Sequence, residues 1–205
     1  MPRDKSESHI QVVKAMQEEF LEKGFEKASM RSIAQKCGLS VAGLYRHFAS
    51  KEDMFEAFAK PLVDQVNQWA QNHRNTKYEQ VNHGHISRQS LFEDSQIDLI
   101  ENVIYPKKEA YCILFYKAQG SQYENYLDQF VDAQVLEMMD FFCALKEKGI
   151  DVESPSKEEL HMLLSVYTAA LLQPIQHLYS EEKTKHCLKM VEEFFLPGWI
   201  NIMKI

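Results

Sequence analysis

The side chains best suited to binding chemistry cluster near the start of the sequence. Residues 27–51 contain no Asp or Glu, although the chain as a whole has a formal net charge of -7. The same stretch carries one histidine, His47, and five basic residues: Lys27, Arg31, Lys36, Arg46 and Lys51. Phosphate contacts dominate nucleic-acid affinity, and they need a surface that is clear of carboxylates. The stretch therefore predicts a contact with a polyanion, with a chance basic face as the alternative.

Two short helices are expected to position these side chains. Ser29 can cap a helix over residues 30–37, which Gly38 ends, and Ser40 can cap a second helix over residues 41–48. Two short helices joined by a glycine-containing turn are typical of the helix-turn-helix arrangement. Their expected small core consists of Ile33, Ala34, Leu39, Leu44 and Phe48.

A longer helix is expected ahead of this pair. It ends at Gly24, because glycine readily adopts the left-handed conformation that closes a helix. Its apolar face repeats at helical spacing through Ile10, Val13, Met16 and Phe20.

The second short helix opens with small residues and continues with polar ones. Val41, Ala42 and Gly43 would let its start approach the major groove of DNA closely. Its outer side then offers a hydroxyl, a guanidinium and an imidazole, from Tyr45, Arg46 and His47. Tyrosine and histidine can donate to phosphate, and Arg46 is best suited to bidentate reading of guanine.

The next helix is predicted to begin at Ser50. Its N-terminal amides, together with Lys51, form a possible phosphate clamp. The plainer alternative is that Ser50 and Asp53 only cap the helix.

Residues 29–55, SMRSIAQKCGLSVAGLYRHFASKEDMF, closely resemble the DNA-binding segment of the TetR family of bacterial transcriptional regulators. The matching elements are Ile33-Ala34, Gly38, Tyr45, Phe48 and Lys51. The sequence departs from the pattern at Gly43, which lies two residues before Tyr45 instead of three, and at Cys37, where alanine is common.

The resemblance implies an all-α homodimer that represses genes until a small molecule binds its C-terminal domain. Residues 1–55 would form a three-helix helix-turn-helix DNA-binding domain, and residues 56–205 a helical ligand-binding and dimerisation domain. The implied phosphate contacts are Ser40, Tyr45, His47 and Lys51, and the implied base contacts are Ala42, Gly43 and Arg46. Arg31 is included among the DNA-binding residues for its charge.

The remainder of the chain carries no family motif, but it is rich in aromatic residues between positions 105 and 142. Ligand pockets are mostly apolar with a few polar groups, so these aromatics and three later polar residues predict a pocket. Ordinary core packing is the alternative. The expected pocket residues are Tyr105, Tyr111, Phe115, Tyr126, His161, Gln173 and His177.

The last two helices are expected to pair with their symmetry mates in a homodimer. A capping box at Ser156 opens the first of them, which is apolar almost all round. Ser180 opens the second, which is expected to run to Phe195 before Pro197. An intramolecular core is the alternative to this four-helix interface.

Between the two regions, helical patterning runs from Lys51 to about His73 and includes Pro61. Pro61 is a possible hinge, or else the helix ends and restarts there. Residues 72–88 are polar and aperiodic, which predicts an exposed loop. His83 and His85 in that loop are a weak metal signal without further ligands, so we expect neither metal nor cofactor.

Composition excludes several other classes of protein. The four cysteines are widely spaced, without a CxxC pair, and are expected to be buried apolar residues. Residues 160–180 lack charge but contain too many polar groups and a proline for a membrane span. The N-terminus has no apolar leader, so we expect a cytoplasmic protein. The predicted function is a ligand-responsive repressor of a palindromic operator, with a helix-turn-helix adaptor as the alternative and an enzyme a distant third.

Overall fold

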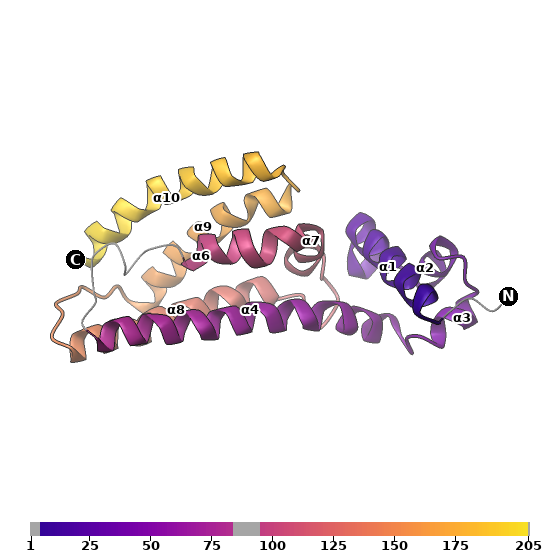
Figure 1. Ribbon diagram of the computed structural model, residues 1–205, viewed down its shortest axis with the longest axis horizontal. Helices are drawn as coiled ribbons and strands as arrows, with labels where there is room; N and C mark the ends of the chain where they lie inside the picture. The colour runs from indigo at the N-terminus through magenta and orange to yellow at the C-terminus, as the bar shows by residue number, and fades with distance from the viewer. Residues whose placement is uncertain (1–4, 84–94, 205) are drawn as a thin grey trace. The chain divides into compact units, whose positions relative to one another are not determined.

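The computed structural model describes residues 5–83 and 95–204 (Figure 1). Every regular element in these two ranges is helical, which confirms the predicted all-α class. The elements are α1 (Lys5–Lys27), α2 (Met30–Lys36), α3 (Val41–Tyr45), α4 (Lys51–Asn82), α6 (Ser95–Asp98), the π-helical η1 (Leu99–Ile104), the 3-10 turn η2 (Tyr105–Lys107), α7 (Lys108–Tyr116), α8 (Tyr126–Glu147), α9 (Lys157–Gln176) and α10 (Glu181–Met203).

The chain divides into two compact units. The first unit consists of residues 1–65 together with 107–126, and the second of residues 66–106 together with 127–205. The first unit is thus larger than the predicted domain of residues 1–55, because α7 packs against α1. The amide of Phe25 donates a hydrogen bond to the carbonyl of Lys117 at 2.8 Å and joins these two parts.

The predicted serine caps are all present. The hydroxyls of Ser29, Ser40 and Ser50 accept hydrogen bonds from backbone amides three residues later at 2.9–3.1 Å. Ser156 forms the predicted capping box with Glu159, and Ser180 caps α10. Such caps satisfy amides that have no partner within the helix, which explains why these helices begin where they do.

Helix α1 breaks at Gly24, as its sequence predicts. Gly24 has φ 73 and ψ 168, a backbone conformation that residues other than glycine rarely adopt. One further helical turn follows and reaches Lys27. The buried face of α1 differs in part from the predicted one. Ile10 is 67% exposed, whereas Val12, Ala15, Met16, Glu19 and Phe20 are buried.

The core of the first unit joins α1 to the short helices and to α4. Ile33 and Leu44 are fully buried, as predicted, whereas Leu39 and Phe48 are half-buried. The Phe55 ring meets the rings of Phe20 and Phe25 edge-on, with centroids 5.0 and 4.9 Å apart. Edge-to-face packing of this kind stabilises aromatic clusters beyond the burial of their area.

Helix α4 continues through the segment predicted to be a loop. It passes Pro61 without ending and runs to Asn82, so the restart at Pro61 is wrong, and the loop predicted from residue 72 is wrong as far as residue 82. Its polar residues bond within the helix, with the amide of Gln71 donating to Asn75 at 3.1 Å. Residues 84–88 lie outside the described residues, and the hinge at Pro61 stays a prediction.

The second unit has its core between α4, α8, α9 and α10. Val135, Leu145, Leu160 and Met203 are fully buried there. Helix α10 contacts α9 and continues through Pro197 to Met203, which corrects its predicted end at Phe195. Thr184 and Leu188 near its start are buried, as are Trp199 and Met203 near its end.

Two of the four cysteines differ from their predicted burial. Cys37 and Cys112 are buried as expected, but Cys143 is exposed and Cys187 is half-buried. Within the described ranges, no helix is long and apolar enough to cross a membrane.

Candidate nucleic-acid and ligand sites

Helix α3 presents polar side chains from a very short element. It ends at Tyr45, three residues earlier than predicted, and Arg46 is its C-cap. The side chains of Ala42, Tyr45, Arg46 and His47 are exposed, and that of Tyr45 is 49% exposed. Four of the predicted DNA-binding residues therefore lie on accessible surface of the first unit.

Gly43 differs from its predicted role as a position facing a base. It is buried, and a Cβ atom there would lie 3.2 Å from Ser40 Oγ. Its amide donates to Ser40 Oγ at 3.0 Å, so Gly43 helps to close the first turn of α3. The hydroxyl hydrogen of Ser40 is not used by this cap and can be donated to a phosphate.

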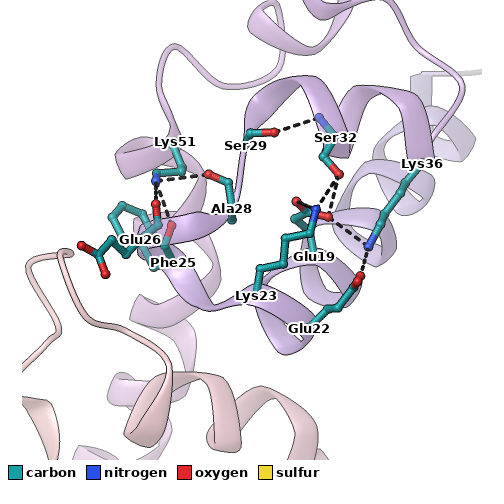
Figure 2. A network of polar contacts seen from close by, with 10 residues as sticks. All are labelled: Glu19, Glu22, Lys23, Phe25, Glu26, Ala28, Ser29, Ser32, Lys36 and Lys51. Carbon is teal, nitrogen blue, oxygen red and sulfur yellow. Dashed lines mark hydrogen bonds and ion pairs between the residues drawn. The ribbon is translucent and has the colours of Figure 1, made fainter.

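The basic surface is smaller than the sequence indicates, because Lys36 is paired with carboxylates of α1. Its ammonium lies 3.0 Å from Glu19 Oε2 and 2.9 Å from Glu22 Oε2 (Figure 2). The stretch 27–51 lacks acidic residues in the sequence, but the fold brings acidic residues of an earlier helix to it. Lys36 is therefore held by an internal ion-pair network.

Glu19 is the buried centre of this network. Its side chain is fully buried and also accepts hydrogen bonds from Lys23 and Ser32, each at 2.8 Å. Burial by itself would raise the pKa of Glu19, but the hydrogen bonds from Lys23, Ser32 and Lys36 outweigh it and lower this pKa to about 2. The carboxylate stays charged and ties α1 to α2.

Lys51 also makes internal contacts. Its ammonium donates to the carbonyl oxygens of Phe25, Glu26 and Ala28 at 2.8, 3.1 and 3.3 Å (Figure 2). These carbonyls lie at the C-terminal end of α1 and just after it, a position that favours a cation. The ammonium also lies 4.3 Å from the centroid of the Phe25 ring. All three of its hydrogens are directed to the protein, so the geometry favours a structural role over the predicted phosphate clamp.

Three other cations of the stretch are better placed for DNA. Among the described residues, Lys27, Arg31 and Arg46 have exposed side chains with no hydrogen-bond or ion-pair partner. His47 lies near them in the sequence, and its ring centroid is 6.4 Å from that of exposed His9 on α1. His9 was missed in the sequence because it precedes the carboxylate-free stretch.

The residues predicted to form a ligand pocket are not brought together. Tyr111, Phe115 and Tyr126 stack in the core of the first unit, where the Tyr111 hydroxyl donates to the Leu62 carbonyl at 3.2 Å. The other four belong to the second unit. Tyr105 donates to the Tyr179 carbonyl, whereas exposed side chains are found at His161, Gln173 and His177.

The described part of the second unit contains a different cavity, of about 140 Å³. None of the seven predicted pocket residues lines it. Its walls come from α4, α6, η1, α8 and α9, and the side chains on which the later argument depends are Trp69, His73, Lys77, Gln134, Glu137 and Phe141. These residues were missed because polar positions on α4 and α8 show no motif until the two helices are placed together.

The polar groups of this cavity are perturbed by burial. Burial, and then the nearby charge of Lys77, lower the pKa of His73 to about 4, so its imidazole is neutral at neutral pH. Burial also lowers the pKa of Lys77 and raises that of Glu137, while the attraction between these two side chains acts in the opposite direction. The Trp69 indole stacks on His73 with centroids 5.0 Å apart.

The described ranges contain no group of three or more His, Cys, Asp or Glu side chains arranged around a metal position. His83 lies just after α4, and its Nδ1 is 2.8 Å from the carbonyl oxygen of Glu79. His85 lies outside the described residues.

A serine-capped helix, a glycine turn and a second capped helix with exposed polar side chains are the features of a helix-turn-helix DNA-binding domain. Residues 12–58 match the family described as bacterial regulatory proteins, tetR family. This segment is a helix-turn-helix domain of the TetR family, which confirms the resemblance found in residues 29–55.

Curated relatives are transcriptional regulators. The HTH-type transcriptional regulator UidR of Escherichia coli K12 is 37% identical over 57 residues, which are 28% of this chain and 29% of UidR. The match thus spans less than a third of that relative. The HTH-type transcriptional regulator SAB2452 of Staphylococcus aureus is 26% identical over 178 residues, which are 86% of this chain and 87% of the relative.

A solved structure with a similar chain path comes from Mesorhizobium loti and is assigned to the TetR family of transcriptional regulators. It is 14% identical, covers 97% of each chain and has a TM-score of 0.49.

Proposed function

We propose that the chain is a DNA-binding transcriptional regulator that acts as a homodimer and leaves its operator when a small molecule binds. One observation carries this proposal: the exposed Tyr45, Arg46 and His47 at the end of α3, within a segment that matches a family of DNA-binding regulators. A recognition helix needs accessible polar side chains at this position.

Each exposed residue has a distinct role in the proposed complex. The guanidinium of Arg46 is suited to the O6 and N7 atoms of guanine, and the methyl group of Ala42 to the methyl group of thymine. Tyr45, His47 and the hydroxyl of Ser40 donate to phosphates, which fix the position of the helix on the duplex. Lys27 and Arg31 add attraction to the backbone without sequence preference.

The proposed dimer uses α9 and α10. Both helices belong to the second unit and expose large apolar side chains. Contact of this apolar surface with water is unfavourable, and a partner that covered it would remove that cost. The exposed fractions of these side chains are 56–78% at Met162, Val166, Met190 and Phe194. A twofold dimer would place two copies of α3 in successive major grooves about 34 Å apart, which corresponds to a palindromic operator.

The remaining parts of the proposal follow from DNA binding. A dimer bound over a promoter blocks access to it, so repression requires no catalytic group, and we assign none. We place the chain in the cytoplasm with the DNA that it binds. The effector would shift the dimer away from the spacing that DNA requires, and this makes DNA and effector binding mutually antagonistic.

The test starts from duplexes selected from a random library by the full chain and measures their binding by fluorescence anisotropy. Replacing Arg46 with alanine should weaken binding about 5- to 150-fold, since a bidentate base contact contributes about 1–3 kcal/mol. The matched control is Arg74→Ala, which removes the same charge from α4 of the second unit, where Arg74 pairs with Asp140 at 3.3 Å.

The slope of log affinity against log salt gives a second readout. Each phosphate contact should contribute about -0.9 to this slope. Arg31→Ala should therefore lower the magnitude of the slope by about one. Failure to select any duplex at low salt, or equal affinity in the Arg46→Ala protein and the parent, would rule out the proposed interface.

A further inference from the structure

The cavity of the second unit contains buried polar atoms that nothing in the described chain satisfies. Nε2 of His73 and Nε2 of Gln134 are both buried without a hydrogen-bond partner among the described residues. Both residues line the cavity. Most buried polar atoms in proteins are paired, and leaving one unpaired costs about 1–3 kcal/mol. Two such atoms in one apolar cavity indicate a bound molecule with complementary polar groups.

The hydrogen-bonding capacity of the two atoms defines what that molecule must offer. The Oε1 atom of Gln134 accepts a hydrogen bond from Gln96, so its free amide nitrogen is a donor that needs an acceptor. The imidazole of His73 is neutral because burial lowers its pKa to about 4. Its Nε2 can thus accept from a hydroxyl or donate to an oxygen, according to tautomer.

The walls of the cavity favour a planar ring. Aromatic side chains line it on α4 and α8, and the Trp69 and His73 rings lie within 9° of parallel. The aromatic residues of α8 that line the cavity are Phe130, Phe141 and Phe142. Offset stacking and edge-to-face contacts with such rings favour an aromatic ligand over an aliphatic one.

The volume and the charges of the cavity further restrict the class of ligand that fits it. A cavity of about 140 Å³ compares with the engineered cavity of about 150 Å³ that binds benzene, so one ring with small substituents fits. Two side chains of the lining, Lys77 and Glu137, have opposite charges that attract each other. Their charges cancel, and a charged ligand would leave one of them without compensation in a desolvated site.

We propose that this cavity binds uncharged single-ring aromatic compounds that carry a carbonyl or hydroxyl oxygen, with Gln134 and His73 as the polar contacts. The assignment deepens the ligand response, and the role of such a compound as an effector rests on the proposed function. Its binding to the cavity does not depend on DNA.

The test is calorimetric titration of the full chain with 4-hydroxyacetophenone as the probe. We expect one saturable site per chain, and about tenfold weaker binding in His73→Phe and in Gln134→Leu, because each loses one buried hydrogen bond. The matched controls are His161→Leu and Gln173→Leu, whose exposed side chains lie outside the cavity. Both controls should bind like the parent, and a loss of binding in them instead would overturn the assignment.

Two further probes test the class of ligand on the unmodified protein. Toluene lacks the oxygen and should bind more weakly than 4-hydroxyacetophenone, and 4-hydroxybenzoate should bind more weakly because it is charged. Tighter binding of either, or no binding of 4-hydroxyacetophenone, would refute the proposal. Because this comparison uses the unmodified protein, it tests the proposed class of ligand even if circular dichroism shows that a cavity variant does not fold.

The same preparation is tested for DNA binding by anisotropy, so that the two proposals can fail separately. Probe binding without DNA binding contradicts the proposed function and leaves the cavity assignment intact. DNA binding without probe binding contradicts the cavity assignment and leaves the proposed function intact. Release of DNA by 4-hydroxyacetophenone in the parent, but not in Gln134→Leu at the same concentration, would connect the two.

Discussion

The carboxylate of Glu19 on α1 is fully buried and accepts a hydrogen bond from the hydroxyl of Ser32 on α2 at 2.8 Å (Figure 2). Lys23 and Lys36 bind the same carboxylate. Because α2 is the first helix of the helix-turn-helix, these contacts fix the scaffold from which α3 presents its side chains.

Replacing Glu19 with glutamine should destabilise the fold by about 2–3 kcal/mol, since hydrogen bonds to buried charged groups contribute about 1.5–3 kcal/mol each and the amide keeps only part of them. Urea denaturation followed by circular dichroism measures the change. The matched control is Glu22→Gln, which removes an exposed carboxylate bound to the same Lys36 and should leave the midpoint almost unchanged. Equal effects of the two substitutions would show that burial of Glu19 is not what matters.

The same network makes stability depend on acid pH. Hydrogen bonds from its neighbours lower the pKa of Glu19 from 4.5 to about 2 against the opposing effect of burial. A lowered folded-state pKa gives stability that is complete above pH 4.5 and is lost as the pH falls through about 2. The difference in unfolding free energy between the parent and Glu19→Gln should therefore be constant near neutrality and shrink in acid. A difference that is undiminished at the lowest pH of a urea series would contradict this origin.

Substitution of Lys51 should lower the free energy of unfolding rather than remove a contact with DNA. Replacing it with methionine removes the ammonium that donates to the carbonyls of Phe25, Glu26 and Ala28, and we expect the free energy of unfolding to fall by about 1–2 kcal/mol in urea denaturation. Lys27→Met removes an exposed cation from the same stretch and should not alter stability. If Lys51→Met weakens DNA binding while its stability stays that of the parent, the phosphate clamp is correct and the structural role is wrong.

Two glycines should respond to alanine with opposite signs. At Gly24 the φ of 73 lies in a region that is costly for alanine, so Gly24→Ala should destabilise by about 1–3 kcal/mol. Gly198 lies within α10, and a Cβ there meets nothing within 4 Å. Gly198→Ala should stabilise by about 0.5–1 kcal/mol, because alanine loses less backbone entropy on folding into a helix. Thermal unfolding of both variants tests the pair, and the same sign in both would argue against a special conformation at Gly24.

Local signals in the sequence were sufficient to predict the starts of the serine-capped helices. A serine cap depends on residues within one turn, so Ser29, Ser40, Ser50 and Ser180 could be identified without knowledge of the fold. The end of α4 could not be predicted in the same way. Residues 72–82 show few apolar positions, yet they remain helical because Val81 is buried in the core of the second unit.

Sites that depend on tertiary contacts were harder to predict. The charge of Lys36 is compensated by Glu19 and Glu22, which lie outside the stretch that was counted. The cavity could not be predicted for the same reason, because His73 and Gln134 lie on different helices and are 61 positions apart in the sequence. Aromatic content indicated Tyr111 instead, but its burial reflects core packing in the first unit.

The proposed dimer makes a direct prediction about Phe194, whose side chain is 78% exposed on α10. In a dimer through α9 and α10 this ring would be covered, and Phe194→Asp would place a charge in an apolar interface, where its desolvation is costly. Sedimentation equilibrium should then show a dimer for the parent and a monomer for the variant. Leu136→Asp is the matched control, because Leu136 is 54% exposed but lies on α8. A parent that is monomeric at micromolar concentration, or a Leu136→Asp protein that dissociates while Phe194→Asp stays dimeric, would remove α10 from the interface.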